Sequence, residues 1–361
     1  MATKQKYVDL SKMEKEHFHY NLVMGERSNG KSFWVKRFCL REAFRNPNKA
    51  RFVYLRRYQI ESRAADVEAY FRDAPIQDIT AGKYTMISVY KGQIFFANID
   101  PETGKVVRGE VAGYVAYLSS ESHFKSQNFN DVTEIIYEEF LTDEGYLWRE
   151  PEKLQSFVST VARKRKIRIW MIGNTINRTC PYFTEYGLTG AINQEQGTLQ
   201  VYEHVTDQIN EDGSPVVVRI GVYYTPQTEN TSKMFFGAMS KMTTSGKWQT
   251  RSYPHMPYHY RDCKKIYNIL LRHNEFMFNI EAIKTPKNEY ILFIHPHTGK
   301  TEGQRIIDSA PDPSPLVSSK LNPIKRGDKL VSYLLDSGSL FFSDNLTGAD
   351  WESVIKEVGG L

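Results

Sequence analysis

The sequence predicts an α/β fold with a central, mainly parallel sheet, followed by a smaller α+β C-terminal domain. Apolar strand-like runs alternate with helical patterns as far as about residue 200, an order typical of layered α/β domains. Beyond residue 250, three strand-like runs separated by short turns predict a meander instead. The length of 361 residues also exceeds the size at which a single core usually stops growing, so we expect two domains.

The elements of the first domain are predicted from hydrophobic periodicity. They are a strand at 17–24, a helix at 32–41, a strand at 51–55, a helix at 60–71, antiparallel strands at 85–99 and 106–118, a strand at 135–137, a helix at 153–163 and a strand at 167–172. In such a sheet, ligands bind at the carboxyl ends of the strands.

Composition shifts predict the domain boundaries. The first domain is expected to cover residues 1–205, a linker residues 206–250, and the C-terminal domain residues 251–361. Within the last, the meander strands are predicted at 265–272, 276–283 and 289–295, a loop at 309–323 and a final helix at 350–358.

Composition and charge favour a packed, reduced protein. Hydrophobic residues make up 40% and aromatic residues 13% of the chain, which argues against disorder. The net charge of +5 is compatible with a nucleic-acid partner without requiring one. Cys39, Cys180 and Cys263 form no C-x-x-C pair, and the sequence predicts neither a signal peptide nor a membrane span, so we expect a cytoplasmic protein without a zinc site.

Residues 25–32 fit the phosphate-binding motif G-x-x-x-x-G-K-[ST] between an expected strand and an expected helix. Glycines let backbone N–H groups converge on a phosphate, and the positive end of the helix dipole favours the same anion. Lys31 is expected to reach the β- and γ-phosphates, and the Ser32 hydroxyl to hold Mg²⁺. The predicted nucleotide-binding residues are Gly25, Glu26, Arg27, Ser28, Asn29, Gly30, Lys31 and Ser32.

Two carboxylates, Glu138 and Glu139, follow the apolar strand at 135–137. A phosphate loop needs one acid for the metal and its water shell, and one to orient the attacking water. We assign Glu138 to Mg²⁺ and Glu139 to the catalytic base, although an Asp usually occupies the first position. The alternative for a Glu-Glu pair is a solvated strand end.

Two further polar residues and one basic run each have more than one interpretation. Asn174 either senses the γ-phosphate and positions the water, or forms a turn after Gly173. Arg27 either touches the γ-phosphate or couples to Glu139, or faces solvent. The basic run at 163–168 either complements a helix dipole, supplies an arginine finger to a neighbouring subunit, or contacts DNA phosphates.

An ordered set of motifs resembles the DNA-packaging ATPases (encapsidation proteins) of small protein-primed podophages of the phi-29 type. The matching stretches lie in family order over about the first half of the chain, at 25–32, 52–58, 112–114, 135–140, 160–163 and 181–183. The resemblance implies a P-loop NTPase of the additional-strand, catalytic-glutamate class that uses ATP and Mg²⁺. It further implies a homo-oligomeric ring, a pentamer, that drives double-stranded DNA into a preformed capsid.

The resemblance also assigns roles to particular residues. Arg163 would reach into the neighbouring subunit's site, Lys125 would be a second trans-acting cation, and Arg27 matches an arginine that the family carries in its phosphate loop. Glu138 departs from the family pattern, which has Asp. The implied partners are duplex DNA, the capsid portal and a packaging RNA, with no membrane, and the implied location is the host cytoplasm and transiently the portal vertex.

For the C-terminal domain, the resemblance implies an RNase H-like nuclease that has lost its chemistry. Two-metal nucleases need converging carboxylates, whereas Glu281, Asp308 and Asp336 are scattered and are interpreted as surface charges. His295 and His297 are interpreted as solvent-exposed. We therefore expect no nuclease activity.

Three other functions remain open on the sequence. One is another P-loop DNA translocase or a helicase, which would share the first site. A second is a small-molecule P-loop kinase, against which the adjacent Glu138 and Glu139 favour water as the acceptor. A third is a scaffold whose nucleotide is structural.

Overall fold

The computed structural model describes residues 7–143, 145–163, 165–176, 178–210, 212–228, 252–301, 304–308 and 326–357. The chain divides into two compact units, the first formed by residues 1–176 and 180–248 and the second by 177–179 and 249–361. The first unit has a large, mostly parallel sheet, so the predicted α/β fold is confirmed.

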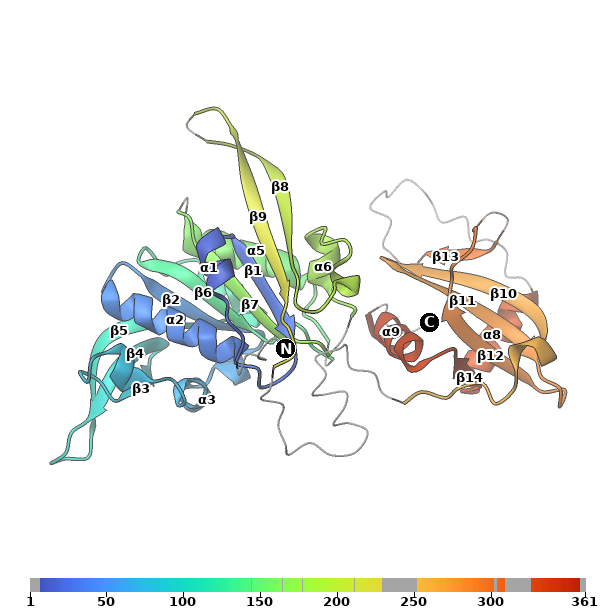
Figure 1. Ribbon diagram of the computed structural model, residues 1–361, viewed down its shortest axis with the longest axis horizontal. Helices are drawn as coiled ribbons and strands as arrows, with labels where there is room; N and C mark the ends of the chain where they lie inside the picture. Colours follow the sequence, from blue (N-terminus) through green and yellow to red (C-terminus); the bar gives the residue numbers. More distant parts are fainter. Residues whose placement is uncertain are drawn as a thin grey trace, which may run out of the picture. The chain divides into compact units, whose positions relative to one another are not determined.

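The sheet of the first unit has nine strands in the order β3-β4-β5-β2-β6-β7-β1-β9-β8. In chain order they are β1 (Tyr20–Gly25), β2 (Arg51–Arg56), β3 (Met86–Tyr90), β4 (Gln93–Ile99), β5 (Val106–Tyr117), β6 (Val132–Glu138), β7 (Arg168–Asn174), β8 (Leu199–Ile209) and β9 (Pro215–Tyr224). The six central strands, β5, β2, β6, β7, β1 and β9 in spatial order, pair in parallel with their neighbours. Antiparallel pairs form both edges of the sheet. The β8–β9 hairpin projects beyond the sheet (Figure 1). Strand β7 separates β1 from β6, as expected for the additional-strand class.

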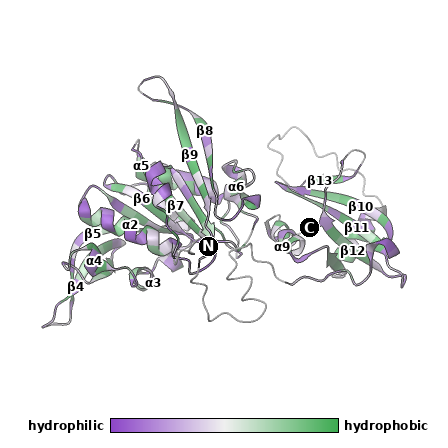
Figure 2. Ribbon diagram, viewed as in Figure 1, coloured by the Kyte–Doolittle hydropathy of each residue, from purple (hydrophilic) through white to green (hydrophobic). Residues whose placement is uncertain are grey.

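Helices cover both faces of this sheet. They are α1 (Ser11–Glu16), α2 (Lys31–Arg45), α3 (Ala64–Phe71), α4 (Ile76–Ile79), α5 (Glu150–Ala162) and α6 (Pro181–Glu185). Three 3₁₀ segments accompany them, namely η1 (Gln59–Ser62), η2 (Leu118–Phe124), which is kinked at Ser120, and η3 (Ala191–Asn193). On one face, Phe38 of α2 and Phe71 of α3 share a core with Phe52 and Trp170, while α5 packs against β6 and α6 on the other. Because both faces are covered, the central strands are apolar on both sides, and hydrophobic residues concentrate in the strands (Figure 2).

Two predicted elements of the first unit are divided in the structure. The helix expected at 60–71 is interrupted at Arg63, whose extended backbone (φ −65°, ψ 147°) separates η1 from α3. The strand expected at 85–99 turns at Lys91 and Gly92, both with positive φ, and becomes the hairpin β3–β4. The sequence pattern does not reveal these breaks because the apolar residues keep their spacing across them.

The predicted linker at 206–250 begins too early. Residues as far as Tyr224 belong to the sheet of the first unit, because β9 pairs in parallel with β1, with Leu22 opposite Val222. The polar run at 207–215 contains the turn of the β8–β9 hairpin and is no domain boundary. The rest of the predicted linker, 229–250, lies outside the described residues.

The second unit has a five-stranded sheet in the order β13-β10-β11-β12-β14. Its elements are η4 (Tyr260–Asp262), β10 (Lys264–His273), β11 (Phe276–Lys284), β12 (Tyr290–Pro296), β13 (Ile306–Asp308), α8 (Arg326–Asp336), β14 (Leu340–Phe342) and α9 (Asn345–Glu357). The antiparallel meander β10–β12 is confirmed, and β13 and β14 add parallel edges. The likeness to an RNase H-like fold stays a prediction, and the loop expected at 309–323 lies outside the described residues.

Helices α8 and α9 cover one face of this second sheet, where Val331, Leu334 and Trp351 pack among the strand residues. Helix α9 begins five residues earlier than predicted, because Asp344 caps it by accepting a hydrogen bond from the Thr347 N–H at 2.8 Å. No helix in the described part of the chain combines the length and the apolar character that crossing a membrane requires.

The interpretation of Glu281 as a surface charge is wrong. Its side chain is buried on β11, where it accepts hydrogen bonds from Tyr260 at 2.6 Å and Lys265 at 3.1 Å. His295 is half-buried, with its Nε2 atom 3.6 Å from the Glu281 carboxylate, so it is not the freely exposed imidazole we expected. Tyr260 of η4 and the neighbouring strands β10 and β12 supply these partners, which the spacing along one strand does not reveal.

Candidate functional site

The phosphate loop, residues 25–32, connects β1 to α2 as a strand, turn and helix N-terminus. Gly30 immediately precedes α2 and has a left-handed φ of 92°. At Gly25, an added Cβ atom would lie 1.9 Å from Thr225 Oγ1 on the neighbouring chain segment. Close packing therefore requires a glycine at residue 25, and the left-handed backbone favours a glycine at residue 30.

Lys31 is buried at the centre of this loop. Its Nζ atom donates hydrogen bonds to the Glu26 carbonyl at 2.5 Å, to Asn29 Oδ1 at 3.2 Å and to Asn174 Oδ1 at 3.3 Å. Burial lowers the pKa of Lys31 to about 7, against the opposing effect of the Glu138 and Glu26 carboxylates. The nearby carboxylates therefore do not offset the cost of burying the Lys31 ammonium group, and an anion bound in the loop would stabilise it further.

Residues beyond β9 hold the loop from the other side. The Asn29 Nδ2 atom donates to Thr225 Oγ1 at 2.8 Å. Buried Glu26 accepts two hydrogen bonds at 2.7 Å through Oε1, from the backbone N–H and the hydroxyl of Thr228. The sequence indicated Glu26 and Asn29 as loop residues but carried no signal for these threonines, which lie about 200 residues away.

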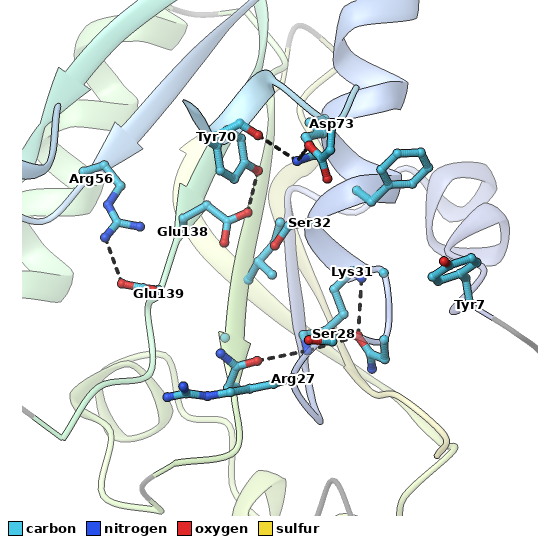
Figure 3. A pocket seen from close by; sticks show the side chains of 17 residues that line it. Tyr7, Arg27, Ser28, Lys31, Ser32, Arg56, Tyr70, Asp73, Glu138 and Glu139 are labelled. Atoms are coloured by element: carbon cyan, nitrogen blue, oxygen red, sulfur yellow. Dashed lines mark hydrogen bonds and ion pairs between the residues drawn. The ribbon is translucent and has the colours of Figure 1, made fainter. Parts of the chain in front are cut away.

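Glu138 is buried at the end of β6. The Tyr70 hydroxyl donates to Glu138 Oε1 at 2.6 Å (Figure 3). The Ser32 hydroxyl also stabilises the ionised carboxylate of Glu138 through a hydrogen bond that lowers its pKa. Burial raises the pKa of Glu138, while these two hydrogen bonds oppose that shift. The structure therefore brings together the two residues that we expected to hold Mg²⁺.

Glu139, the next residue, lies in a different environment. Its backbone has a φ of 59°, its side chain is 59% exposed, and it lines a cavity next to the phosphate loop. Arg56, at the end of β2, donates a hydrogen bond from Nη2 to Glu139 Oε2 at 2.8 Å (Figure 3). Arg56 also pairs with Glu61 at 3.3 Å, so its guanidinium bridges two carboxylates.

Arg57 fixes the backbone around Glu139. It donates to the carbonyl oxygens of Glu139 and Phe140 at 3.1 and 3.2 Å, and binds the buried Glu150 carboxylate through two hydrogen bonds at 2.8 and 3.0 Å. Tyr137 donates to the same carboxylate at 2.6 Å. Pairing and hydrogen bonding offset the cost of burying both charges, and the network holds the positive-φ turn in place.

The phosphate loop and the two adjacent acids line one cavity of about 730 Å³. Its lining includes Arg27, Ser28, Asn29, Gly30, Lys31, Ser32, Glu138, Glu139 and Asn174 from the predicted set. It also includes Tyr7, Phe33, Lys36, Arg56, Tyr70 and Asp73, which the sequence analysis did not select. The position of Arg56 at the end of an expected strand could have indicated that it lies at the site. The spacing of residues along the chain did not indicate Tyr70.

Arg163 and Lys125 do not line this cavity in the part of the chain that the structure describes. Arg163 is exposed at the end of α5, and its guanidinium donates to the Gln127 carbonyl at 3.1 Å. Lys125 is exposed two residues before Gln127. The two cations thus lie near one another on the first unit, away from its own phosphate loop.

The fold and the site define a P-loop protein, in which a phosphate loop and an acidic strand end meet across an intervening parallel strand. Residues 2–219 match the family model described as Podovirus DNA encapsidation protein (Gp16), and the chain belongs to this family.

Curated relatives resemble about half of the chain. It is 28% identical over 193 residues to the DNA packaging proteins of Bacillus phage B103 and Bacillus phage phi29. These matches cover 52% of this chain and 53% and 52% of the two relatives, so the chain spans about half the length of the curated relatives it matches.

One solved structure is similar over nearly the whole chain. It is a chain of the bacteriophage Phi-29 viral genome packaging motor assembly, with a TM-score of 0.51 and 19% sequence identity. The match covers 98% of this chain and all of that chain, and at this identity it shows likeness of fold.

Proposed function

We propose that this protein is an ATPase whose hydrolysis drives double-stranded DNA into a preformed capsid. The observation that carries the proposal is the meeting of Lys31, Glu138 and Glu139 in one cavity of an encapsidation-family chain. The relatives described as DNA packaging proteins support the same activity for this chain.

The residues of the cavity fit ATP with Mg²⁺. The hydroxyl of Ser32 and the carboxylate of Glu138 are hard oxygen donors that already contact each other, the arrangement that Mg²⁺ favours in phosphate-loop sites. When bound, the metal neutralises charge on the phosphates. Lys31 is proposed to pair with the phosphates, and this pairing would offset the cost of burying its ammonium group.

Glu139 is proposed as the base that orients the attacking water and accepts its proton. Its exposed carboxylate faces the cavity, as that role requires, and Arg56 holds it in place. Asn174 contacts Lys31 and is proposed to position the water or sense the γ-phosphate through its amide. Arg27 lines the same cavity and is proposed to contact the γ-phosphate.

Arg163 and Lys125 are proposed to complete the site of a neighbouring subunit. Their exposure, their proximity and their distance from their own chain's cavity support a trans role. The proposal therefore includes a homo-oligomeric ring, with a pentamer, the portal, a packaging RNA and a transient location at the portal vertex in the host cytoplasm as its further parts.

Steady-state ATP hydrolysis by the purified chain, with and without long duplex DNA, tests this function. We expect DNA to stimulate hydrolysis at modest salt and the stimulation to fade as salt rises, because a translocase contacts mainly phosphates. The Lys31→Ala variant is the control for contaminating activity. If neither DNA nor empty capsids stimulate the wild type above this variant, the motor function is wrong.

A further inference from the structure

Tyr70 provides the hydrogen bond that holds the carboxylate of Glu138. It lies near the end of α3, and its hydroxyl donates to Glu138 Oε1 at 2.6 Å (Figure 3). A tyrosine hydroxyl donates one hydrogen bond, and the donor of Tyr70 is used on this carboxylate.

The ring of Tyr70 is itself held by α2, the helix that follows the phosphate loop. Buried Lys36 donates from Nζ to the Tyr70 carbonyl at 2.8 Å and lies 4.6 Å from the centroid of its ring. Lys36 also pairs with Asp73. On the other side, the Tyr54 ring packs with its centroid 4.6 Å from that of Tyr70. Because Lys36 and Tyr54 hold the Tyr70 side chain, its hydroxyl is pre-organised to donate to Glu138.

This arrangement matters because Glu138 is a glutamate. A glutamate side chain has one more rotatable bond than an aspartate, so its carboxylate samples more positions unless it is restrained. The Tyr70 bond occupies one carboxylate oxygen, and the Ser32 hydroxyl contacts the same group. The restraint thus acts on the pair of oxygen donors that fits a divalent cation.

We propose that Tyr70, held by Lys36, is a positioning residue that fixes the Glu138 carboxylate for binding the nucleotide's Mg²⁺. This inference rests on the part of the proposed function in which the cavity binds Mg²⁺ with a nucleotide, and does not depend on DNA translocation.

The test is the metal dependence of nucleotide binding, measured with fluorescent mant-ADP in excess Mg²⁺ and in EDTA. The Tyr70→Phe variant keeps the ring and loses only the hydroxyl. Because a hydrogen bond to a charged group stabilises by an amount that corresponds to about tenfold or more in affinity, we expect Tyr70→Phe to reduce the strengthening by Mg²⁺ about tenfold. Binding in EDTA should change less than twofold, because that hydroxyl does not contact the phosphate loop.

Three further variants test whether the effect of Tyr70→Phe is specific to its hydrogen bond with Glu138. Tyr84→Phe removes the hydroxyl of another buried tyrosine that does not line the cavity, and should behave as the wild type. Lys36→Met should reduce the Mg²⁺ effect in the same direction, through a loosened Tyr70. In a Glu138→Ala background, Tyr70→Phe should have no additional effect on the metal dependence, because the group it positions is gone.

Several outcomes would overturn the inference. An unchanged Mg²⁺ effect in Tyr70→Phe would do so, as would an equal loss of affinity in EDTA, which would indicate a general structural role. If the wild type bound no nucleotide at all, this inference and the proposed function would both fail. If the wild type bound the Mg²⁺ nucleotide and Tyr70→Phe behaved as expected, absence of DNA stimulation would remove the motor function alone.

Discussion

At the scale of single residues, the two adjacent carboxylates of this site differ because their surroundings differ. Glu138 ends a buried strand and is bonded to Tyr70, whereas Glu139 turns out of the strand with a positive φ and is paired with Arg56. A buried acid bonded to Ser32 suits a metal, and an exposed acid at the cavity suits a water molecule. In the proposed function, one residue type thus serves two chemical roles because the two positions differ in burial and partners.

Replacing Glu139 by Gln should leave ATP binding within a few-fold of the wild type and slow hydrolysis by roughly 10²- to 10⁴-fold, the range of general-base catalysis. Filter binding and single-turnover hydrolysis would measure the two effects separately. Glu61→Gln is the matched control, because Glu61 is the other carboxylate on Arg56. Unchanged turnover in Glu139→Gln would remove Glu139 from the catalytic role.

A second prediction at this scale concerns Glu134, which is buried and bonded to Arg168 and Trp170. Burial raises its pKa to about 7, against the opposing effect of these partners. Because the pKa of Glu134 in the folded protein lies above its ordinary value of 4.5, folding favours the protonated form. Its stabilising effect is complete below pH 4.5 and is lost as the pH rises to about 7.

The free energy of unfolding of the wild type, relative to Glu134→Gln, should therefore fall between pH 4.5 and 7 by up to about 3 kcal/mol and stay level above that range. Denaturant unfolding at several pH values would measure it. Glu110→Gln, which replaces an exposed carboxylate paired with Lys83, is the control substitution. A flat difference for Glu134→Gln would mean that this carboxylate is ionised throughout.

At the scale of secondary-structure elements, β9 and the chain after it shape the phosphate loop. β9 lies next to β1, so that Thr225 packs against Gly25 and bonds to Asn29. The loop is thus supported on one side by β7, through Asn174, and on the other by the residues that follow β9. Its conformation depends on two strands that are distant in sequence.

Gly25→Ala should destabilise the first unit by more than 2 kcal/mol, because the new methyl group would overlap the Thr225 hydroxyl; overpacking of this kind costs about 1–3 kcal/mol or more. Adding Thr225→Ala should recover part of the loss. Gly82→Ala is the control: its left-handed φ of 80° imposes strain, but no atom lies within 4 Å of an added Cβ. Thermal melting with and without ATP would measure these effects, and a Gly25→Ala protein as stable as Gly82→Ala would contradict the packing argument.

At the scale of the whole molecule, one chain holds the phosphate loop and both acids but keeps two candidate cations elsewhere. Arg163 and Lys125 lie on the surface of the first unit and do not line its cavity in the described residues. An assembly in which one subunit's surface meets the next subunit's cavity would bring them together. We therefore expect hydrolysis to depend on assembly.

Mixing Lys31→Ala and Arg163→Ala proteins should recover part of the ATPase activity that each lacks, because a hybrid interface can contain one intact cavity and one intact arginine. Mixing Lys31→Ala with Glu139→Gln is the control, since both residues belong to the same cavity and no hybrid restores it. ATPase rates across mixing ratios would measure the effect. If no mixture of the first pair exceeds its components, Arg163 does not act in trans.

The sequence by itself determined the features that depend on local patterns. The phosphate loop between a strand and a helix, the acidic strand end and the C-terminal meander are each encoded within about thirty consecutive residues, so spacing and glycine placement were sufficient to predict them. Parallel strands bring their carboxyl ends to one edge, so the meeting of Lys31 and Glu138 could also be expected.

Only the tertiary structure decided which distant residues complete these features. The contacts of Tyr70 with Glu138, of Thr228 with Glu26 and of Tyr260 with Glu281 join separate elements, and no periodicity along the chain encodes them. The same holds for β9, whose place beside β1 turned an expected linker into part of the sheet. Burial and hydrogen bonding act between residues that are close in space, and the order of strands in a sheet, which sets that closeness, arises from the packing of the whole unit.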